Sequence, residues 1–370
     1  MKLLLSDRHL EKREEFARFA DQEMDADGQF PRDNLQKAAE RGYMGLPIPE
    51  KYGGRGEDFL TYILLLEEVS RVCASTGVIM AVHTSVGSFP LLYYGNAAQK
   101  EKYLPGLAGG SLIGAFALTE AGAGSDAAAL STKAEACDEG YLLNGNKLFI
   151  TSGGEADLYT IFATLDRSAG RKGICAFLVE KTFKGLRPGE PERKMGLKRS
   201  LTTELQIENM PVPSANLLGR EGEGFNIAMS LLDGGRIGIA AQGLGLARAS
   251  IEYTRLLLKK REVGRPGTAR DAASILAGLE TRFEAARLLT YRAAVLKENG
   301  VRCSAEASMA KAFSTDLAVD AAIQCMDICG REHYSAGGEL ARYFCDAKAT
   351  QIYEGTNQIQ RIVVAREMLK

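Results

Sequence analysis

A glutamate close to the end of the sequence is the residue best suited to do chemistry. Glu354 lies in Gln351-Ile-Tyr-Glu354-Gly-Thr356, with apolar residues before it and a glycine after it. An apolar setting would raise the pKa of its carboxyl above the ordinary ~4.3 and suit it to act as a general base. A surface glutamate at a helix end is the simpler interpretation of the residue taken alone, so both interpretations stay open.

A run of small residues earlier in the chain could hold a ligand. In Thr119-Glu-Ala-Gly122-Ala-Gly124-Ser125-Asp126, the small side chains leave backbone N–H groups uncovered, and Thr119 and Ser125 add hydroxyls. Such a segment suits an anionic or carbonyl-rich ligand, although a plain turn is the simpler explanation. Phe149-Ile-Thr151, taken alone, is only the end of a strand.

Two other glycine pairs have different meanings. Asp233-Gly-Gly-Arg236 places two glycines in a helical pattern, where each costs about 1 kcal/mol relative to alanine. That cost indicates close approach by a ligand or another backbone. Gly243-Leu-Gly245 lies in a helical run without a preceding strand, so the dinucleotide fingerprint is excluded, and no GxxxxGK[ST] phosphate loop occurs.

Composition excludes several classes of function. The chain has 46 Lys+Arg and 47 Asp+Glu, so it has no broad basic field that would favour nucleic acid or an anionic membrane. Its three histidines, at positions 9, 83 and 333, are scattered, and we expect no metal site. The seven cysteines form no CxxC pair. Cys325 and Cys329 could share a helix face as a metal or redox pair, but small buried apolar residues are the simpler interpretation.

Cysteine usage and apolar runs also bear on location. A reduced, cytoplasmic setting fits an odd number of cysteines without a disulfide framework. The apolar residues of the N-terminus are too few for a signal-peptide core, and no run approaches 18 apolar residues. We therefore expect a cytoplasmic protein without a membrane span.

The elements that must position these residues change character twice along the chain. A length of 370 residues favours two or three domains. Helical periodicity gives way near residue 113 to short β-rich runs, and it returns as long helices over 225–260, 270–298 and 302–328. We predict a multidomain α+β protein with an N-terminal helical domain (1–112), a central β-barrel or sandwich domain (113–220) and a C-terminal helical bundle (221–370).

Within the β domain, one pattern predicts a hairpin. Tyr141–Leu143 and Lys147–Thr151 are separated by Asn144-Gly145, which suits the positive φ values of a two-residue turn. Asn146 could shift the register of the two strands.

Taken together, the motifs resemble the acyl-CoA dehydrogenase family over essentially the whole chain, in the right order. The short-chain, butyryl-type branch is nearest. The matching stretches are Leu118-Thr-Glu-Ala-Gly-Ala-Gly-Ser-Asp126, Phe149-Ile-Thr151, Lys194-Met-Gly196, Asn216-Leu-Leu-Gly-Arg-Glu-Gly-Glu-Gly-Phe225, Leu232-Asp-Gly-Gly-Arg236 and Asp346-Ala-Lys-Ala-Thr-Gln-Ile-Tyr-Glu-Gly-Thr356.

The resemblance implies a fold, a cofactor and a reaction. The fold would be an N-terminal helical domain, a central β domain and a C-terminal four-helix bundle, assembled as a homodimer or homotetramer. FAD would bind between domains and across a subunit interface. The reaction would be α,β-desaturation of an acyl-CoA thioester, with electrons leaving through an electron-transferring flavoprotein.

The resemblance also implies residue roles. Glu354 matches the catalytic base; the glutamate that replaces it in some branches corresponds here to Gly235. FAD would contact Phe116, Leu118, Thr119, Ser125, Phe149, Thr151, Lys260, Asp327, Arg331, Thr356, Asn357 and Gln358. The substrate would contact Ser125, Asp233, Arg236 and Gly355.

The sequence departs from the family in its C-terminal part. Lys260-Arg-Glu-Val263-Gly-Arg-Pro266 stands where the family has Arg-x-x-Phe-Gly-Lys-Pro, and Arg261 could serve for the lost arginine after a small shift. Asp327 replaces a glutamine, and Gly330-Arg331-Glu332-His333 replaces a glycine-rich run. In most members this region holds the FAD adenosine and pyrophosphate across the dimer. Asp327 would repel a pyrophosphate, whereas Arg331 could attract it.

Three functional hypotheses follow. The first is a FAD-dependent short-chain acyl-CoA dehydrogenase with a remodelled adenosine pocket. The second keeps the fold but acts on an acyl chain held by a carrier protein. The third is a binding member with weakened FAD affinity, which the intact Thr119, Ser125, Thr151 and Glu354 argue against.

Overall fold

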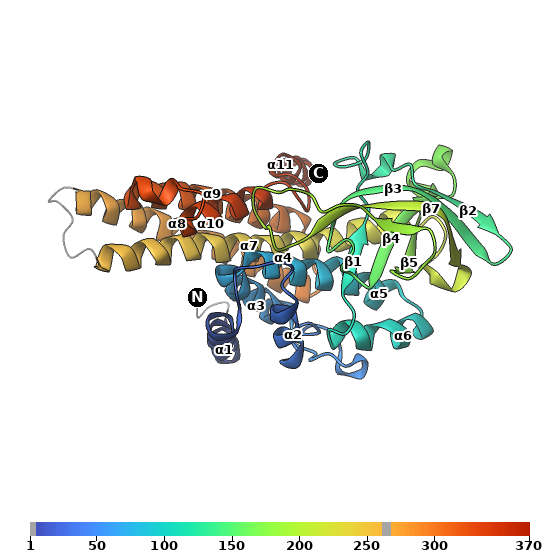
Figure 1. Ribbon diagram of the computed structural model, residues 1–370, viewed down its shortest axis with the longest axis horizontal. Coiled ribbons are helices and arrows are strands. Elements are labelled where there is room, and N and C mark those ends of the chain that lie inside the picture. The colour runs from blue at the N-terminus through green and yellow to red at the C-terminus, as the bar shows by residue number, and fades with distance from the viewer. Residues whose placement is uncertain (1–4, 261–267) are drawn as a thin grey trace.

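The computed structural model describes residues 5–260 and 268–370, in three parts that follow the chain (Figure 1). The first part is helical: α1 (Asp7–Glu23), α2 (Arg32–Glu40), α3 (Phe59–Val72), α4 (Ala74–Val82), α5 (Phe89–Tyr94) and α6 (Ala97–Ala108). The second is a sheet: β1 (Gly114–Ala117), β2 (Lys133–Cys137), β3 (Gly140–Thr151), β4 (Leu158–Thr164), β5 (Ile174–Glu180), β6 (Leu186–Pro188), β7 (Thr202–Pro213) and β8 (Leu217–Leu218). The third is again helical: α7 (Gly224–Lys260), α8 (Thr268–Glu298), α9 (Ser304–Cys329), α10 (Glu339–Thr350) and α11 (Asn357–Met368).

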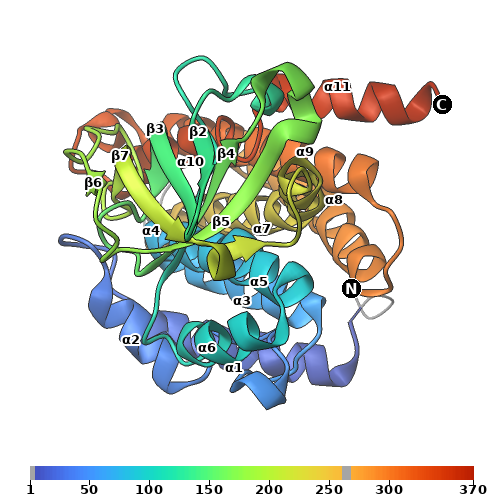
Figure 2. The ribbon, with the colours of Figure 1, turned by 90° about the vertical axis from the view of Figure 1, so that its right-hand side faces the viewer.

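The predicted order of helical, β and helical parts is therefore confirmed. Figure 2 shows the sheet in front, with the N-terminal helices along one side of it and the C-terminal helices along the other. The residue numbers chosen for the domain boundaries stay predictions.

The sheet consists of two halves that fold onto each other. Its strand order is β6-β7-β3-β2-β4-β5-β8, with β1 parallel to β4. The halves are joined by a single backbone pair, between Lys133 of β2 and Thr164 of β4. Tyr141 of β3 and Phe177 of β5 come from different halves, yet their ring centroids lie 5.0 Å apart. An apolar core therefore fills the space between the halves, as expected of the predicted barrel or sandwich.

The predicted hairpin at Asn144-Gly145 is wrong. These residues lie inside the continuous strand β3, where the pairing with β7 shifts between Leu143 and Gly145. Gly145 has φ 157°, and a Cβ there would meet the Thr132 side chain at 2.5 Å. The glycine thus serves a β-bulge, which leaves the same signal in the sequence as a tight turn. The hairpin that does form joins β2 to β3 between Cys137 and Gly140.

Among the described residues, one helical stretch meets the length and composition of a membrane span. Ala74–Tyr94 has a mean hydropathy of 1.2 in its most apolar window, and 94% of that window is buried inside the protein. The stretch comprises α4, a π-helical segment (His83–Ser88) and α5. Such burial is typical of a core helix.

Helix α7 forms the spine of the C-terminal part and runs without interruption through both glycine pairs. A Cβ at Gly243 would lie 2.9 Å from Ser314 O of α9, and one at Gly245 would lie 2.6 Å from Glu67 O of α3. These glycines therefore let neighbouring helices approach α7 closely, which is a packing role.

Two of the sequence motifs join the β domain to the helical bundle. In Lys194-Met-Gly196, a Cβ at Gly196 would lie 2.1 Å from the backbone oxygen of Cys345 in α10. The next residue, Leu197, donates its backbone N–H to the buried Asp346 carboxylate at 2.5 Å. This contact fixes α10, and the turn after α10 carries Glu354.

Candidate active site

A cavity of about 700 Å³ lies where the sheet, α7 and the C-terminal turn meet. It brings together residues predicted from distant parts of the sequence. They are Phe116, Leu118, Thr119, Ser125, Phe149, Thr151, Asp233, Arg236, Glu354 and Gly355. The remaining walls include apolar residues of the π-helical segment, α7 and α11, such as Val86, Phe225, Met229, Ile359 and Val363.

Glu354 occupies a strained turn between α10 and α11. Its φ is 52°, in the left-handed region, and Gly355 follows with φ 84°. The amide of Gln360 holds this turn by donating to Glu354 O at 3.0 Å and to Gly355 O at 2.8 Å. A non-glycine residue in this conformation costs free energy, and such strain clusters at functional sites.

The carboxylate of Glu354 has no described hydrogen-bond donor. Its Oε2 atom is buried without a partner. A Cβ at Gly235 would lie only 2.6 Å from that oxygen, so the close approach expected at the α7 glycines is made by the Glu354 side chain. Burial raises the pKa of Glu354 to about 7, although Arg236 and Lys311 favour its charged form. A carboxyl with this pKa can take a proton near neutral pH.

The small-residue loop that lines the cavity is anchored by a buried ion pair. Glu120 accepts hydrogen bonds from Ser131 N at 2.6 Å, Thr132 N at 3.0 Å and Lys147 Nζ at 2.7 Å. Lys147 also donates to Leu118 O at 3.2 Å and is fully buried. Despite burial, these donors lower the pKa of Glu120 to about 2, while burial lowers the pKa of Lys147 to about 8. The pair fixes both ends of the loop.

The side chain of Phe149 projects away from the sheet and is largely exposed. Its φ is 57°, the β3–β7 pairing shifts between Lys147 and Ile150, and its side chain is 62% exposed. An aromatic residue of this size is normally covered. The bulge therefore aims Phe149 at the cavity, which it lines together with Thr151.

Asp233 and Arg236 lie on the adjoining turn of α7. Arg236 donates to Asp233 at 3.0 Å, and Ser304 of α9 donates to the other Asp233 oxygen at 2.7 Å. Arg236 is buried, and its Nε atom has no described partner. The cavity therefore contains a cation that is only partly neutralised.

Three predicted cofactor residues lie at the start of α11. Thr356 caps the helix by accepting from Ile359 N at 3.3 Å, and it lines a second cavity of about 340 Å³ together with Gln358. Asn357 is 4% exposed, and its amide is engaged by Lys311, Thr315 and Asp316. Its side chain therefore anchors α11.

The structure does not bring the predicted residues of the altered region into the cavity. Lys260 ends α7, 24 residues beyond Arg236, which is about 36 Å along a helix. The end of α9 lies at the same end of the bundle, because Cys329 contacts Thr254 at 3.6 Å. Asp327 accepts a hydrogen bond from Tyr334, and the His333 ring lies 5.9 Å from that of Tyr253.

The roles predicted for Lys260, Asp327 and Arg331 therefore cannot be exerted on the cavity of their own chain. Val263 and Arg261 lie outside the described residues.

Sequence reasoning missed Lys311, Gln360 and the Glu120–Lys147 pair. Each joins the site through a buried polar contact between elements far apart in the sequence. Lys311 lies in an Ala-rich helical run that is equally typical of a surface. The sequence did contain one indication for Glu120, because this carboxylate lies inside a motif of small residues. A carboxylate that is buried there needs hydrogen-bond donors from elsewhere in the chain.

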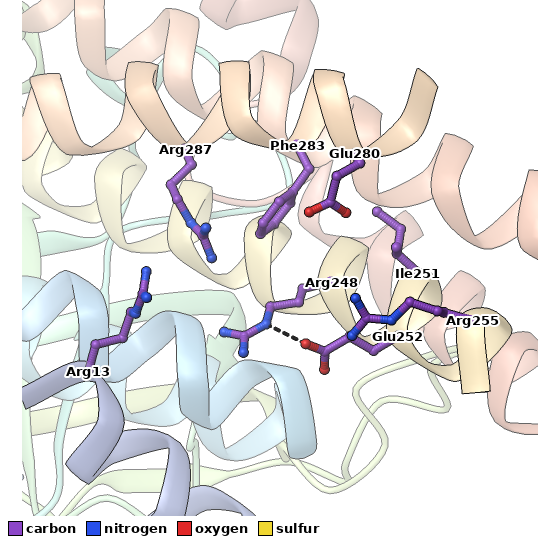
Figure 3. Close-up of a pocket in the computed structure, with 8 residues that line it drawn as sticks. All are labelled: Arg13, Arg248, Ile251, Glu252, Arg255, Glu280, Phe283 and Arg287. Atoms are coloured by element: carbon purple, nitrogen blue, oxygen red, sulfur yellow. Dashed lines mark hydrogen bonds and ion pairs between the residues drawn. The ribbon is translucent and has the colours of Figure 1, made fainter. Parts of the chain in front are cut away.

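Other polar clusters are not candidates for the chemistry. Within the described residues, no group of three or more His, Cys, Asp or Glu could hold a metal ion. A cavity of about 150 Å³ lies between α1, α7 and α8. Arg13, Arg248 and Arg287 point toward it (Figure 3). Two of these arginines are neutralised, Arg248 by Glu252 at 2.8 Å and Arg287 by Glu67 at 2.6 Å. This cavity contains none of the predicted residues.

Comparison with known families matches this architecture part by part. The acyl-CoA dehydrogenase N-terminal domain matches residues 6–111, the middle domain 115–210 and the C-terminal domain 222–369. An acyl-CoA dehydrogenase of Bacillus subtilis is 51% identical over 94% of this chain and 92% of its own length. A short-chain specific acyl-CoA dehydrogenase of Clostridium acetobutylicum is 43% identical over the same shares.

Solved structures agree. Butyryl-CoA dehydrogenase from Megasphaera elsdenii superposes with a TM-score of 0.94 at 39% identity, covering 99% of both chains. A chain from a study of the electron transferring flavoprotein of Acidaminococcus fermentans gives 0.95 at 42% identity, also over 99% of both chains. A prolyl acyl carrier protein oxidase gives 0.93 at 34% identity, over 98% of this chain and 99% of its own.

The chain belongs to the acyl-CoA dehydrogenase family. It is therefore a flavoprotein oxidoreductase of the acyl-CoA dehydrogenase type, and its cofactor is FAD.

The residues of the cavity fit that cofactor. A Cβ added at Gly122 or Gly124 would meet no atom of the described residues within 4 Å, apart from the adjacent residues in the chain, so packing within the described part of the protein does not require these glycines. Small residues there leave room for a ligand beside the loop. Phe149 offers an exposed aromatic face, and Thr119 and Thr151 add hydroxyls to the same cavity. These groups suit a flat, partly polar ring system.

Proposed function

We propose that the protein catalyses the α,β-desaturation of a short-chain acyl-CoA thioester, with Glu354 as the base that takes the α-proton. The observation that carries the proposal is the Glu354 carboxylate itself. It lies on the wall of the cavity, has no described hydrogen-bond partner, and its pKa is raised to about 7 by burial. A base with a pKa near the working pH is ionised in a substantial fraction of the molecules and still binds a proton strongly enough to abstract it.

Two features of the structure support this proposal of proton abstraction from a thioester. The turn at Glu354–Gly355 is fixed by Gln360, so the carboxylate is held in one orientation. Apolar residues of α7 and α11 exclude water from the cavity. The exclusion of water would bring the pKa of the substrate's α-proton closer to the pKa of the Glu354 carboxyl. A backbone N–H of the base turn would stabilise the oxyanion.

Bound FAD supplies the acceptor for the hydride equivalent that leaves the β-carbon. Phe149, Thr151 and the Thr119–Ser125 loop would hold its ring system, and Thr356 and Gln358 would hold a more distant part of it. Asp233 and Arg236 would contact the CoA portion, where a fixed cation suits a phosphorylated nucleotide.

The partners follow from the same proposal. Electrons would leave to an electron-transferring flavoprotein, in line with the similarity to the chain from the Acidaminococcus fermentans study. A homodimer or homotetramer would bring Lys260, Asp327 and Arg331 of one protomer to the cofactor of another. Lys260 lies about 36 Å along α7 from Arg236 of its own cavity, and the end of α9 that leads to Asp327 and Arg331 lies toward the same end of the bundle. We place the protein in the cytoplasm.

A second candidate substrate is an acyl chain held by a carrier protein. It is favoured by the similarity to the prolyl acyl carrier protein oxidase. The higher identity to a short-chain specific acyl-CoA dehydrogenase, 43% against 34% for the carrier-protein oxidase, favours CoA.

The test is an absorption spectrum of the purified protein before and after addition of butyryl-CoA, longer acyl-CoAs and a matched acyl carrier protein thioester. We expect a yellow protein that is bleached by butyryl-CoA, and a Glu354→Gln variant that binds butyryl-CoA but is bleached about 10²–10⁴-fold more slowly. Bleaching only by the carrier-protein thioester would select the second candidate. A colourless protein that stays inactive with added FAD would contradict both.

A further inference from the structure

Lys311 is a buried lysine that lies behind the turn of Glu354. It lies in the first half of α9 and has 0% of its surface exposed. Its Nζ atom donates to Gly355 O at 2.8 Å and to Asn357 Oδ1 at 2.9 Å. A buried ammonium is costly unless its donors are satisfied, so its retention beside the base turn calls for an explanation.

The hydrogen-bond partners of Lys311 are neutral. Gly355 O is a backbone carbonyl and Asn357 Oδ1 is an amide oxygen, and no described carboxylate forms an ion pair with Nζ. Asp316 lies one step further away, because it accepts from the Asn357 amide at 2.7 Å and pairs with Arg361 at 3.3 Å. Burial lowers the pKa of Lys311 to about 7, whereas the nearby Glu354 favours its charged form. Below that pH, Lys311 is therefore an ammonium group whose charge is not offset by a directly paired carboxylate among the described residues.

Arg236 is the other cation close to Glu354, and its situation differs. It forms an ion pair with Asp233 at 3.0 Å, which offsets much of its charge. The other titratable groups around Glu354 are the buried phenols of Tyr62 from α3 and Tyr353 from its own turn, and both are neutral at physiological pH because burial raises their pKa values further. Among the described groups that face Glu354, Lys311 is therefore the cation that has no directly paired carboxylate.

We propose that Lys311 is a positioning residue for the proton-abstraction step. It ties the Glu354–Gly355 turn to α9, and in its ammonium form it supplies a positive charge that favours the carboxylate form of Glu354. This inference rests on the proposed function, in which Glu354 is the base. Gln360 supports the same turn through neutral hydrogen bonds, so the two residues separate the effect of charge from that of orientation.

The test compares three variants of the FAD-loaded enzyme. Lys311→Met removes the charge at similar length. Asn357→Asp keeps Lys311 but places a carboxylate against its Nζ atom and so neutralises it. Gln360→Met removes only the two neutral hydrogen bonds that Gln360 donates to the Glu354–Gly355 turn. The protonation of Glu354 is followed by infrared difference spectroscopy, using the carboxyl band that disappears in Glu354→Gln, and the rate of flavin reduction by butyryl-CoA is followed over the same pH range.

We expect the midpoint of Glu354 ionisation to rise by about one pH unit in Lys311→Met, a tenfold change in its acidity constant. Flavin reduction should then slow about tenfold at pH 6 and less than about twofold at pH 9. Asn357→Asp should move the midpoint in the same direction, whereas Gln360→Met should slow the reaction without moving it.

An unchanged midpoint in a Lys311→Met protein with wild-type flavin absorbance would overturn the proposal. If that variant does not fold, an unchanged midpoint in Asn357→Asp would do so. A Glu354→Gln variant that stays active would instead overturn the proposed function, while the infrared midpoint would still report on Lys311.

Discussion

Glu120 and Glu354 are two glutamates of one active site, and their surroundings differ in kind. Glu120 lies behind the loop that lines the cavity and accepts hydrogen bonds from Ser131, Thr132 and Lys147. Glu354 lies on the cavity wall, and its Oε2 atom has no donor. Both carboxylates are taken out of water, yet the pKa falls to about 2 in the first and rises to about 7 in the second.

The difference teaches that a directly paired cation and hydrogen-bond donors, and not burial alone, decide what a carboxylate does. A saturated carboxylate stays charged and braces the loop, whereas a carboxylate without donors exchanges its proton near neutral pH. Their contributions to stability consequently have opposite pH dependence.

The sign for each glutamate follows from linkage. The lowered pKa of Glu120 stabilises the fold above the unfolded value of about 4.5, and this contribution is lost as the pH falls toward 2. The raised pKa of Glu354 does not lower the free energy of unfolding at pH 4, where the residue is mainly protonated in both the folded and the unfolded state. Its cost develops between about pH 4.5 and 7, where the unfolded chain ionises first.

The largest effect on stability is expected at the Glu120 pair. Lys147→Met leaves a buried carboxylate without its cation and should lower the free energy of unfolding by about 3–5 kcal/mol. The matched control is Lys133→Met, which breaks the exposed pair with Glu135 and should change it by less than about 1 kcal/mol. Denaturant titrations at saturating FAD measure both. Equal effects would show that burial of the Glu120 pair is unimportant.

A methyl group at Gly235 should disturb Glu354 without harming the fold. Gly235→Ala places a Cβ within 2.6 Å of Glu354 Oε2, so the carboxylate must move, and we expect flavin reduction to slow by about a hundredfold. Gly278→Ala is the control in α8, where an added Cβ meets nothing within 4 Å. That control should keep full activity and gain up to about 1 kcal/mol. Full activity in Gly235→Ala would mean that the position of the carboxylate is not critical.

Glu354→Gln should separate function from stability. The substitution removes the cost of a carboxylate without donors, so the variant should be more stable than the wild type by about 1–2 kcal/mol at pH 8 and equal to it at pH 4. Thermal unfolding at the two pH values checks this. A loss of stability at pH 8 would indicate that the Glu354 carboxylate is satisfied by donors after all.

The smallest effect is expected at the glycines of the loop. Gly124→Val fills space that no protein atom occupies, so FAD affinity should fall about tenfold or less while the apoprotein keeps its stability. Titration of the apoprotein with FAD measures the affinity. An apoprotein destabilised as strongly as Lys147→Met would assign Gly124 to the fold and not to the ligand.

Local patterns in the sequence predicted the elements well. The long helices predicted at 225–260, 270–298 and 302–328 are observed at Gly224–Lys260, Thr268–Glu298 and Ser304–Cys329. Apolar periodicity is strong in such helices, since each packs one face along its whole length. At Asn144-Gly145 the same local reasoning failed, because a bulge and a turn make the same demand on glycine.

The candidate site was predicted where residues lie within one motif. Glu354 and the small-residue loop stood out through their immediate neighbours. Lys311 and Lys147 did not, because their partners lie 44 and 27 residues away and nothing local distinguishes a buried lysine from an exposed one. The position of Lys260, far from the cavity, likewise became evident only from the observed length of α7.

The most direct test of the central claim is the pH dependence of flavin reduction by butyryl-CoA in a single turnover. If Glu354 is the base, the rate should rise with a single ionisation near pH 7 and level off above it, and Glu354→Gln should react slowly at every pH with no such rise. The same ionisation in Glu354→Gln, at a comparable rate, would contradict the claim and require another group to take the proton.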